Sequence, residues 1–296
     1  NFIVYHHNSD FVQGRIPSRV LRWADVPVVC VSRNSAATIQ GHGIRPERTP
    51  IVPNAFERSV FHPRGESPRH SHGLVLAGTI LPHKGIDIAL RAFERIRDAV
   101  PDAVLDVYGR NFSGWLDSQP NLLATHWCDA GRCVDWQTVC RELEGVTYHG
   151  EVRPIVLAQA FRTRSLLIMP SRVAEPFPLV SLEAQACGCL PVLPRSGGFP
   201  ETMIEGQTGF LYEENTPRAL ADAVIRLWQA GLPSEEQRRA AERWTARKFA
   251  WETSGRAFLE ILESDARLPL ARWLPLYAWR CLWRTVSRVR MVRGGG

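Results

Sequence analysis

Two glutamates, Glu175 and Glu183, are the residues whose type and spacing point most directly to chemistry. They lie eight positions apart, across a segment that reads as a loop entering a helix. Pro178 suits the first helical turn, and Gly188 suits the position just past the helix end. The free N–H groups at such a helix start bind anions. We therefore expect an elongated anionic ligand, with a sugar beside one carboxylate and a ribose beside the other.

The two glutamates need a scaffold, and the sequence around them alternates between strand and helix patterns. Strands are expected at residues 74–77, 104–108, 147–150, 165–170 and 190–194. Helices are expected at residues 86–100, 154–161, 217–228 and 235–249. Such alternation predicts a parallel sheet covered by helices on both faces. Ligands of these sheets bind at the carboxyl ends of the strands. The expected strand ends include Gly78, Gly109, Gly150 and Pro170.

Residues 1–68 show the same alternation on a smaller scale. Strands are expected at residues 2–5, 26–31 and 51–54, and helices at residues 17–23 and 34–41. Residues 110–146 are less regular, and we expect an insertion plus a helix there. Because the chain begins within an expected strand and without a methionine, we expect it to be a piece of a longer protein.

Composition narrows the class of protein. A chain of 296 residues holds about two domains, and 45% hydrophobic with 22% charged residues is ordinary for a globular protein. The net charge of +6 comes from residues 266–296, which hold seven arginines and no acid, so residues 1–265 are close to neutral. The basic balance therefore does not indicate nucleic-acid binding. No apolar run reaches the ~18 residues that span a bilayer.

Seven scattered cysteines, an odd number, occur in a chain with no signal-peptide pattern. This usage predicts reduced thiols in a cytoplasmic protein. Four residues could be taken for a metal cluster, namely His126, Cys128, Cys133 and Cys140. Their spacing matches no zinc template, so no metal is expected there.

Four motifs follow one another in register around and after the first glutamate. They are the two glutamates, the run from Ala186 to Val192, the Gly-Gly-Phe-Pro-Glu loop at 197–201 and the Gly-Gln-Thr-Gly-Phe-Leu run at 206–211. In order and spacing they resemble those of the family 4 glycosyltransferases. The resemblance covers about residues 25–262, most strongly 74–90 and 165–215.

The resemblance implies an α/β fold of the GT-B type. A Rossmann-like parallel sheet would form the donor domain, beside the C-terminal remnant of a second Rossmann-like domain. Residues 1–68 would be the end of the N-terminal, acceptor-side domain and the crossover. Residues 69–250 would bind the nucleotide-sugar donor, and residues 251–296 would form a returning helix and a basic amphipathic tail. Most of the N-terminal domain would precede Asn1.

The resemblance also implies roles for single residues. Glu175 would accept hydrogen bonds from donor-sugar hydroxyls, Glu183 would hold the ribose, and Lys84 would face the diphosphate. His7 stands in the family's His-Asp or His-Asn element near the reacting carbon, with His6 as the alternative. The expected catalytic residues are thus Glu175, His7 and Lys84.

Further donor contacts are expected at the strand ends and at the helix start. Tyr108 and Gly109 would wall the base pocket. Backbone N–H groups of the helix start would meet the sugar and phosphate. The full further set is Gly78, Thr79, Tyr108, Gly109, Gly150, Arg153, Phe177, Leu179 and Val180.

The sequence departs from the family pattern at Thr79. The pattern is Gly-Arg-Leu-x-x-x-Lys-Gly, and Thr79 stands where it has arginine. The change removes one positive charge and a bidentate donor to phosphate. Arg153 or Arg110 would then compensate, and Thr79 itself could still donate a hydrogen bond.

The C-terminal tail carries a separate signal. Arg280, Arg284 and Arg288 recur every four residues among tryptophans and aliphatic residues at helical spacing. This pattern predicts a basic amphipathic helix within residues 267–293, suited to an anionic membrane surface. The alternative is a helix that packs on the N-terminal domain.

Together these features predict a retaining glycosyltransferase that moves a hexose from a nucleotide sugar to a saccharide or lipid-linked acceptor. The expected setting is cell-surface polysaccharide or glycolipid synthesis, in the cytoplasm and peripheral on the inner face of the membrane. No metal, other cofactor or nucleic acid is expected. One alternative is a catalytically incomplete nucleotide-sugar-binding or membrane-docking remnant acting with another chain. A related GT-B sugar epimerase is the other.

Overall fold

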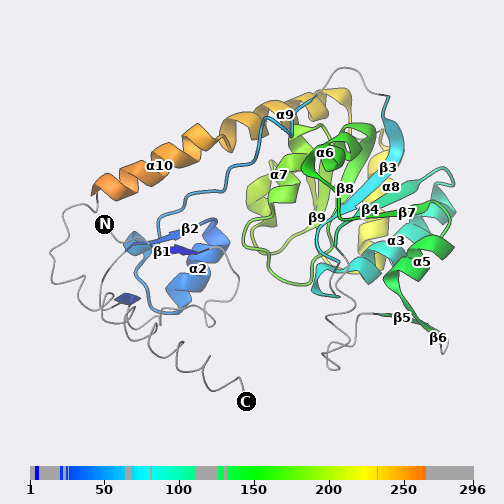
Figure 1. Ribbon diagram of the computed structural model, residues 1–296, viewed down its shortest axis with the longest axis horizontal. Helices are drawn as coiled ribbons and strands as arrows, with labels where there is room; N and C mark the ends of the chain where they lie inside the picture. The colour runs from blue at the N-terminus through cyan, green and yellow to red at the C-terminus, as the bar shows by residue number, and fades with distance from the viewer. Residues whose placement is uncertain are drawn as a thin grey trace, which may run out of the picture. The chain divides into compact units, whose positions relative to one another are not determined.

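The computed structural model describes residues 4–6, 21–22, 25, 27–63, 68–80, 82–110, 126–129, 132–231 and 233–264. The chain divides into two compact units (Figure 1). One consists of residues 1–54 with 251–296, and the other of residues 55–250. The domain limits expected from the sequence, 1–68, 69–250 and 251–296, stay a prediction.

The larger unit is built on a six-stranded sheet whose strands all pair in parallel. Its strand order is β10-β9-β8-β3-β4-β7. The strands are β3 (His70–Ala77), β4 (Val104–Tyr108), β7 (Val146–Gly150), β8 (Arg164–Ile168), β9 (Leu190–Pro194) and β10 (Phe210–Tyr212). The parallel α/β sheet predicted from the sequence is therefore confirmed.

Helices cover both faces of this sheet (Figure 1). They are α3 (Ile86–Ala99), α5 (Trp136–Glu142), α6 (Pro154–Thr163), α7 (Leu179–Ala186), α8 (Pro217–Gln229) and α9 (Glu235–Lys248). The crossovers through α3 and α5 run across the sheet in one direction, and those through α6 and α7 run in the other. Because such crossovers are right-handed, the two pairs of helices lie on opposite faces.

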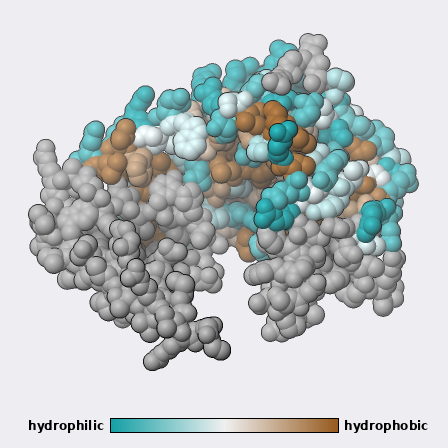
Figure 2. All heavy atoms as spheres, in the orientation of Figure 1, coloured by the Kyte–Doolittle hydropathy of each residue, from teal (hydrophilic) through white to brown (hydrophobic). Residues whose placement is uncertain are grey.

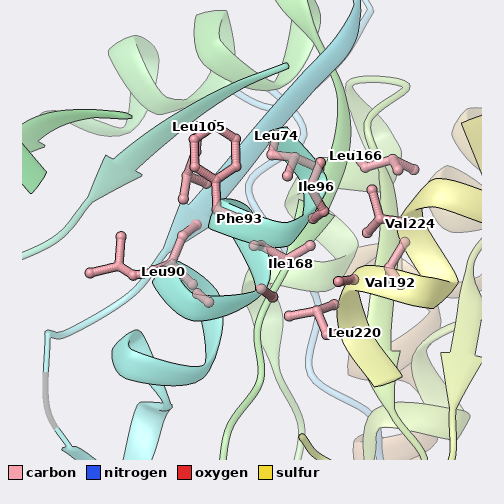
Figure 3. Packing of buried hydrophobic residues seen from close by; sticks show 14 of the residues in the cluster. Leu74, Leu90, Phe93, Ile96, Leu105, Leu166, Ile168, Val192, Leu220 and Val224 are labelled. Carbon is pink, nitrogen blue, oxygen red and sulfur yellow. The ribbon is translucent and has the colours of Figure 1, made fainter. Parts of the chain in front are cut away.

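The main core lies between the sheet and the pair α3 and α8 (Figure 3). In α3 the buried side chains recur at three- and four-residue spacing, which turns one stripe of the helix toward the sheet. Phe93 at the centre of this stripe is 1% exposed. The strands carry apolar residues on both faces, as expected for a sheet covered on both sides.

The smaller unit contains β1 (Val4–His6) and β2 (Val28–Cys30), which pair in parallel. Its helices are α2 (Arg33–Gly41) and α10 (Trp251–Ser264). Ser32 caps the start of α2 through a capping box with Ser35. The Ser254 hydroxyl donates to the carbonyl of Pro53 at 2.8 Å, which ties α10 to the segment after β2.

Two local expectations were wrong. The strand expected at 51–54 is a single bridge between Cys30 and Ile51, since Pro53 has no N–H to extend the ladder. Helix α7 begins at Leu179, and Pro178 is its N-cap rather than part of its first turn. In the segment expected as an insertion plus a helix, the helix is α5, and an antiparallel hairpin, β5 (His126–Asp129) with β6 (Arg132–Asp135), precedes it.

The basic tail expected at 267–293 lies outside the described residues, and so does most of the helix expected at 17–23. None of the described helices combines the length and the apolar character that crossing a bilayer demands.

Candidate functional site

Three neighbouring strands, β3, β4 and β7, run into glycines at the carboxyl edge of the sheet. Gly78, Gly109 and Gly150 all have positive φ angles. The N–H of Gly109 donates to the carbonyl of Gly150 at 2.8 Å. A Cβ on Gly109 would lie 1.6 Å from the carbonyl oxygen of Gly78, so no larger residue fits. The structure thus brings these three expected site residues together as a floor of bare backbone.

Lys84 lies at the end of a short 3₁₀ helix, Pro82–Lys84, that follows β3. The next residue, Gly85, has a φ of 74° and approaches the end of β8 closely. A Cβ there would lie 2.0 Å from the carbonyl oxygen of Pro170. The backbone at Gly85 therefore packs directly against that at Pro170, and the Lys84 turn lies beside the loop that carries Glu175.

Glu175 and Lys84 meet directly. Lys84 Nζ lies 2.6 Å from Glu175 Oε1, and the two side chains are 29% and 11% exposed. The Ser171 hydroxyl donates to the same Oε1 at 2.7 Å. The N–H of Gly198 donates to the backbone carbonyl of Glu175 at 2.6 Å. Both the side chain and the backbone of Glu175 are therefore fixed.

The loop before Glu175 is held by a residue that sequence reasoning missed. The Asn215 amide donates to the carbonyl oxygens of Ser171, at 2.9 Å, and Pro170, at 3.2 Å. Tyr212 in turn donates its hydroxyl to the Asn215 side-chain oxygen at 2.9 Å. Ser171 could have been found as a polar residue just after an expected strand, whereas nothing local marks Asn215.

Helix α7 begins beside this loop without a side-chain cap. Phe177 is buried and packs edge-on against Phe249, with ring centroids 5.6 Å apart. Leu179 is exposed and Val180 half-buried, so the helix start lies at the surface. Figure 2 shows apolar side chains at the surface over α6 and α7, where Ile155 and Leu179 are each 38% exposed. An uncapped helix start with an apolar rim suits an amphipathic anion.

Glu183 lies about one turn further along α7. Burial raises the pKa of its carboxyl to about 7 from an ordinary value of 4.5. Within the described part of the chain, no cation pairs with this carboxylate. Its charge is therefore costly, and a ligand hydroxyl that donates to it would stabilise the charged form.

Tyr108, expected as a wall of a base pocket, is largely buried by contacts within the protein. Its ring stacks on His149 with centroids 4.4 Å apart, and the residue is 7% exposed. Burial raises the pKa of the Tyr108 phenol to about 12. His149 Nε2 lies 2.7 Å from Asp106 Oδ1. Only a small part of the Tyr108 ring remains for a ligand.

The two arginines that were expected to compensate for Thr79 differ in whether a carboxylate already engages them. Arg110 makes two contacts of 2.7 Å with the carboxylate of Glu151. Arg153 is the N-cap of α6, just after β7, and has no ion-pair partner among the described residues. Thr79 itself is half-buried. Arg153 is thus the less committed of the two guanidinium groups.

His7, the remaining expected catalytic residue, lies outside the described residues. In the described part of the chain, no group of three or more His, Cys, Asp or Glu side chains is placed to hold a metal ion. Four of the cysteines are buried free thiols, at positions 30, 140, 187 and 189.

Two solved structures, among others, share this architecture. Anabaena Alr3699/HepE in complex with UDP and glucose matches with a TM-score of 0.70 at 20% identity, over 88% of this chain and 71% of that chain. Sucrose-phosphate synthase from Thermosynechococcus elongatus matches with a TM-score of 0.67 at 19% identity, over 88% of this chain and 68% of that chain. The predicted fold class, α/β of the GT-B type, is confirmed.

Curated relatives include two D-inositol 3-phosphate glycosyltransferases. That of Acidothermus cellulolyticus is 29% identical over 277 residues, which cover 86% of this chain and 58% of the relative. That of Mycobacterium tuberculosis is 30% identical over 251 residues, which cover 81% and 49%. The chain thus spans about half the length of these relatives. The model of the family "Glycosyl transferases group 1" matches residues 61–246, and the chain belongs to that family.

Proposed function

We propose that this chain supplies the donor-binding half of a retaining hexosyltransferase that uses a nucleotide sugar. The observation that carries the proposal is the convergence of Lys84, Glu175 and the uncapped start of α7 at the carboxyl edge of the sheet. Family membership and the glycosyltransferase relatives support it. The match to a fold that holds UDP and glucose supports a nucleotide-sugar ligand.

In this proposal the diphosphate of the donor lies between Lys84 and the start of α7. Transfer of the sugar leaves a nucleoside diphosphate behind, so negative charge grows on the leaving group. An ammonium group and the free N–H groups of a helix start stabilise that charge. The flat backbone floor at Gly78 and Gly109 lets the ligand approach closely.

The two glutamates would hold the ends of the donor. Glu175 accepts hydrogen bonds from sugar hydroxyls, and Glu183 accepts them from the ribose. The raised pKa of Glu183 fits this role, because ribose hydroxyls would stabilise the charged carboxylate. Phe177, Leu179 and Val180 would line the path between them.

Arg153 would be the second cation in place of the arginine that Thr79 replaces. It follows β7, which lies two strands from β3 in the sheet. Two strand spacings amount to about 10 Å, a gap that a long arginine side chain can shorten. Arg110 is the weaker candidate, because its guanidinium is paired with Glu151.

For the reaction, we propose retention by attack on the face from which the diphosphate leaves. The acceptor oxygen bonds to the anomeric carbon as the bond from that carbon to the diphosphate oxygen breaks. The acceptor proton passes to the departing diphosphate, so the protein supplies neither a nucleophile nor a general base. His7 would lie near the reacting carbon.

The setting follows from the tail and from the acceptor class. The basic amphipathic segment at 267–293 would hold the protein on the cytoplasmic face of an anionic membrane. A saccharide or lipid-linked acceptor fits that place, in cell-surface polysaccharide or glycolipid synthesis. A second candidate, nucleotide-sugar binding without turnover, is favoured by one observation: Thr79 removes a phosphate-binding cation and the remaining lysine is paired with Glu175.

Calorimetric titration tests the donor site. Uridine and guanosine diphosphates and their hexose conjugates would be titrated into the protein and into Glu183→Ala. Binding of one nucleotide series, weakened about tenfold by the substitution, supports the proposal. The matched control is Glu144→Ala, an exposed glutamate that pairs with Arg97 and precedes β7, at the opposite edge of the parallel sheet. No binding of any nucleotide would contradict the proposal, and binding without release of diphosphate in the presence of acceptors would favour the second candidate.

A further inference from the structure

The ion pair between Lys84 and Glu175 joins two groups that the proposed function assigns to different parts of the donor. Lys84 would bind the diphosphate, and Glu175 would bind the sugar hydroxyls. In the structure, Lys84 Nζ lies 2.6 Å from Glu175 Oε1. A phosphate oxygen that binds this ammonium therefore competes with the carboxylate for its charge.

The two partners differ in how firmly the protein holds them. Glu175 is 8% exposed, accepts the Ser171 hydroxyl at 2.7 Å on the same Oε1, and is held through its backbone by Gly198. The Lys84 ammonium is carried on a flexible four-carbon stem, and Glu175 is its only ion-pair partner within the described ranges. Lys84 is therefore the partner that can move.

Two arginines near this edge are committed to carboxylates. Arg172, in the Glu175 loop, makes a two-pronged contact with Asp87 at the start of α3. Arg110 does the same with Glu151. Arg153 has no ion-pair partner among the described residues but follows β7, two strands from β3. With Thr79 in the place of an arginine, a diphosphate at the start of α7 therefore draws first on the lysine that Glu175 already holds.

We propose that the Lys84–Glu175 ion pair is a latch that couples the diphosphate subsite to the sugar subsite; this inference rests on the proposed donor-binding function. An intact donor draws the ammonium toward its diphosphate, while its sugar hydroxyls replace the ammonium on the Glu175 carboxylate. A nucleoside diphosphate alone offers no such hydroxyls. The carboxylate then competes fully for Lys84, so the product binds more weakly than the donor and leaves sooner.

The test is the affinity of the free nucleoside diphosphate for Glu175→Gln, measured by calorimetry with uridine or guanosine diphosphate, whichever the protein binds. The amide keeps the size of the side chain and an acceptor for Ser171 but removes the charge that competes for Lys84. We expect the diphosphate to bind about tenfold more tightly and the intact nucleotide sugar to lose its advantage over the diphosphate. A role confined to the sugar predicts no change in diphosphate affinity.

Two further variants sharpen the test. Glu175→Asp moves the carboxylate back by one methylene and should tighten diphosphate binding by about threefold. In the background of Lys84→Met, Glu175→Gln should have no effect, because the shared partner is absent. Glu144→Gln, exposed and just before β7 at the opposite edge of the sheet, is the control for loss of one negative charge.

The outcomes separate the two proposals. If the wild-type protein binds the diphosphate and Glu175→Gln does not bind it more tightly, the latch is wrong and the proposed function stands. If the wild-type protein binds neither diphosphates nor nucleotide sugars, the proposed function fails and the latch fails with it. Thermal unfolding of each variant checks that the compared proteins are folded.

Discussion

Two carboxylates in the larger unit, Glu175 and Asp106, each contact a basic side chain and one further polar side chain, but they differ in position along the sheet. Glu175 lies in the loop beyond β8 and pairs with Lys84, whose side chain is 29% exposed. Asp106 lies inside β4, is 6% exposed, and contacts Arg164 at 2.6 Å and His149 at 2.7 Å. The Lys84–Glu175 pair lies at the carboxyl edge of the sheet, where a ligand can reach it. The Asp106 group is shielded from ligands by the sheet and by the stack of Tyr108 on His149.

The difference shows what makes a charged cluster available for chemistry. Both carboxylates have a cation and a second contact. Asp106 has its partners within the sheet, on the adjacent strand β7 and on β8 two strands away. Ligands therefore have little access, and the group contributes to stability. Glu175 has one fixed partner, Ser171, and one flexible partner, Lys84, so a ligand can replace the latter. Position beyond the strand end, rather than residue type, separates the two roles.

The largest expected effect comes from changing Lys84, the flexible partner of Glu175. Lys84→Met should lower kcat/KM for a nucleotide sugar by about 100- to 1000-fold, because it removes the cation facing the leaving diphosphate. The free energy of unfolding should fall by about 1–2 kcal/mol, because the largely buried Glu175 carboxylate loses its cation but keeps the hydrogen bond from Ser171. Diphosphate release and urea unfolding measure the two quantities. A large loss of stability with intact turnover would show that Lys84, like Asp106, serves stability and not donor binding.

The closed side of the comparison is tested by Asp106→Ala. It leaves Arg164 and His149 without their carboxylate, and the free energy of unfolding should fall by about 2–3 kcal/mol. The fraction of protein that remains folded should bind the donor with unchanged affinity. Urea unfolding followed by calorimetry below the transition checks both. Asp222→Ala, an exposed partner of Arg218 on α8, is the control and should be nearly neutral.

Glu183 offers a pH-dependent test between these extremes. Burial raises the pKa of its carboxyl from 4.5 to about 7, so the folded state binds the proton more tightly than the unfolded chain. Its contribution to stability is full below pH 4.5 and is lost as the pH rises through about 7. Glu183→Gln should therefore raise the free energy of unfolding at pH 8 by about 2 kcal/mol, and by almost nothing at pH 4.5. Equal effects at both pH values in urea unfolding would contradict this account.

The smallest expected effect comes from Thr79→Arg. A second cation next to the floor of Gly78 should tighten nucleoside diphosphate binding by about tenfold, or ~1.4 kcal/mol. Calorimetry at low and high salt measures it, and the gain should shrink at high salt. Arg153→Ala is the companion variant. If it leaves diphosphate affinity unchanged, the proposed second cation is wrong.

Much of the scaffold could be predicted because it depends on local patterns. Apolar runs bounded by glycines marked β4 and β9 at their observed limits, and the stripe of α3 marked a helix that ends within one residue of its expected end. The strand at 51–54 failed because Pro53 cannot donate to a ladder, which a local apolar pattern does not reveal. Helix α7 starts one residue later than its proline suggested.

The candidate site was less predictable because its contacts join distant segments. Lys84 and Glu175 are 91 residues apart, and only the family resemblance placed them at one ligand. Asn215 holds the Glu175 loop from a position after β10, and no periodicity points to it. The engagement of Arg110 by Glu151 is likewise a consequence of strand order. The roles of the expected site residues stay predictions.

The close approach of Gly109 to Gly78 has a consequence for protein engineering. A Cβ at 109 would lie 1.6 Å from the Gly78 oxygen, so mutational libraries gain nothing from varying that position. Because this floor is made of backbone, it offers the same contacts to any nucleotide-sugar donor and does not discriminate between donors. Changes of donor preference, natural or selected in the laboratory, would have to come from side chains around it, such as those of Thr79 and Arg153. A library confined to these two positions would sample specificity while leaving the foundation of the site intact.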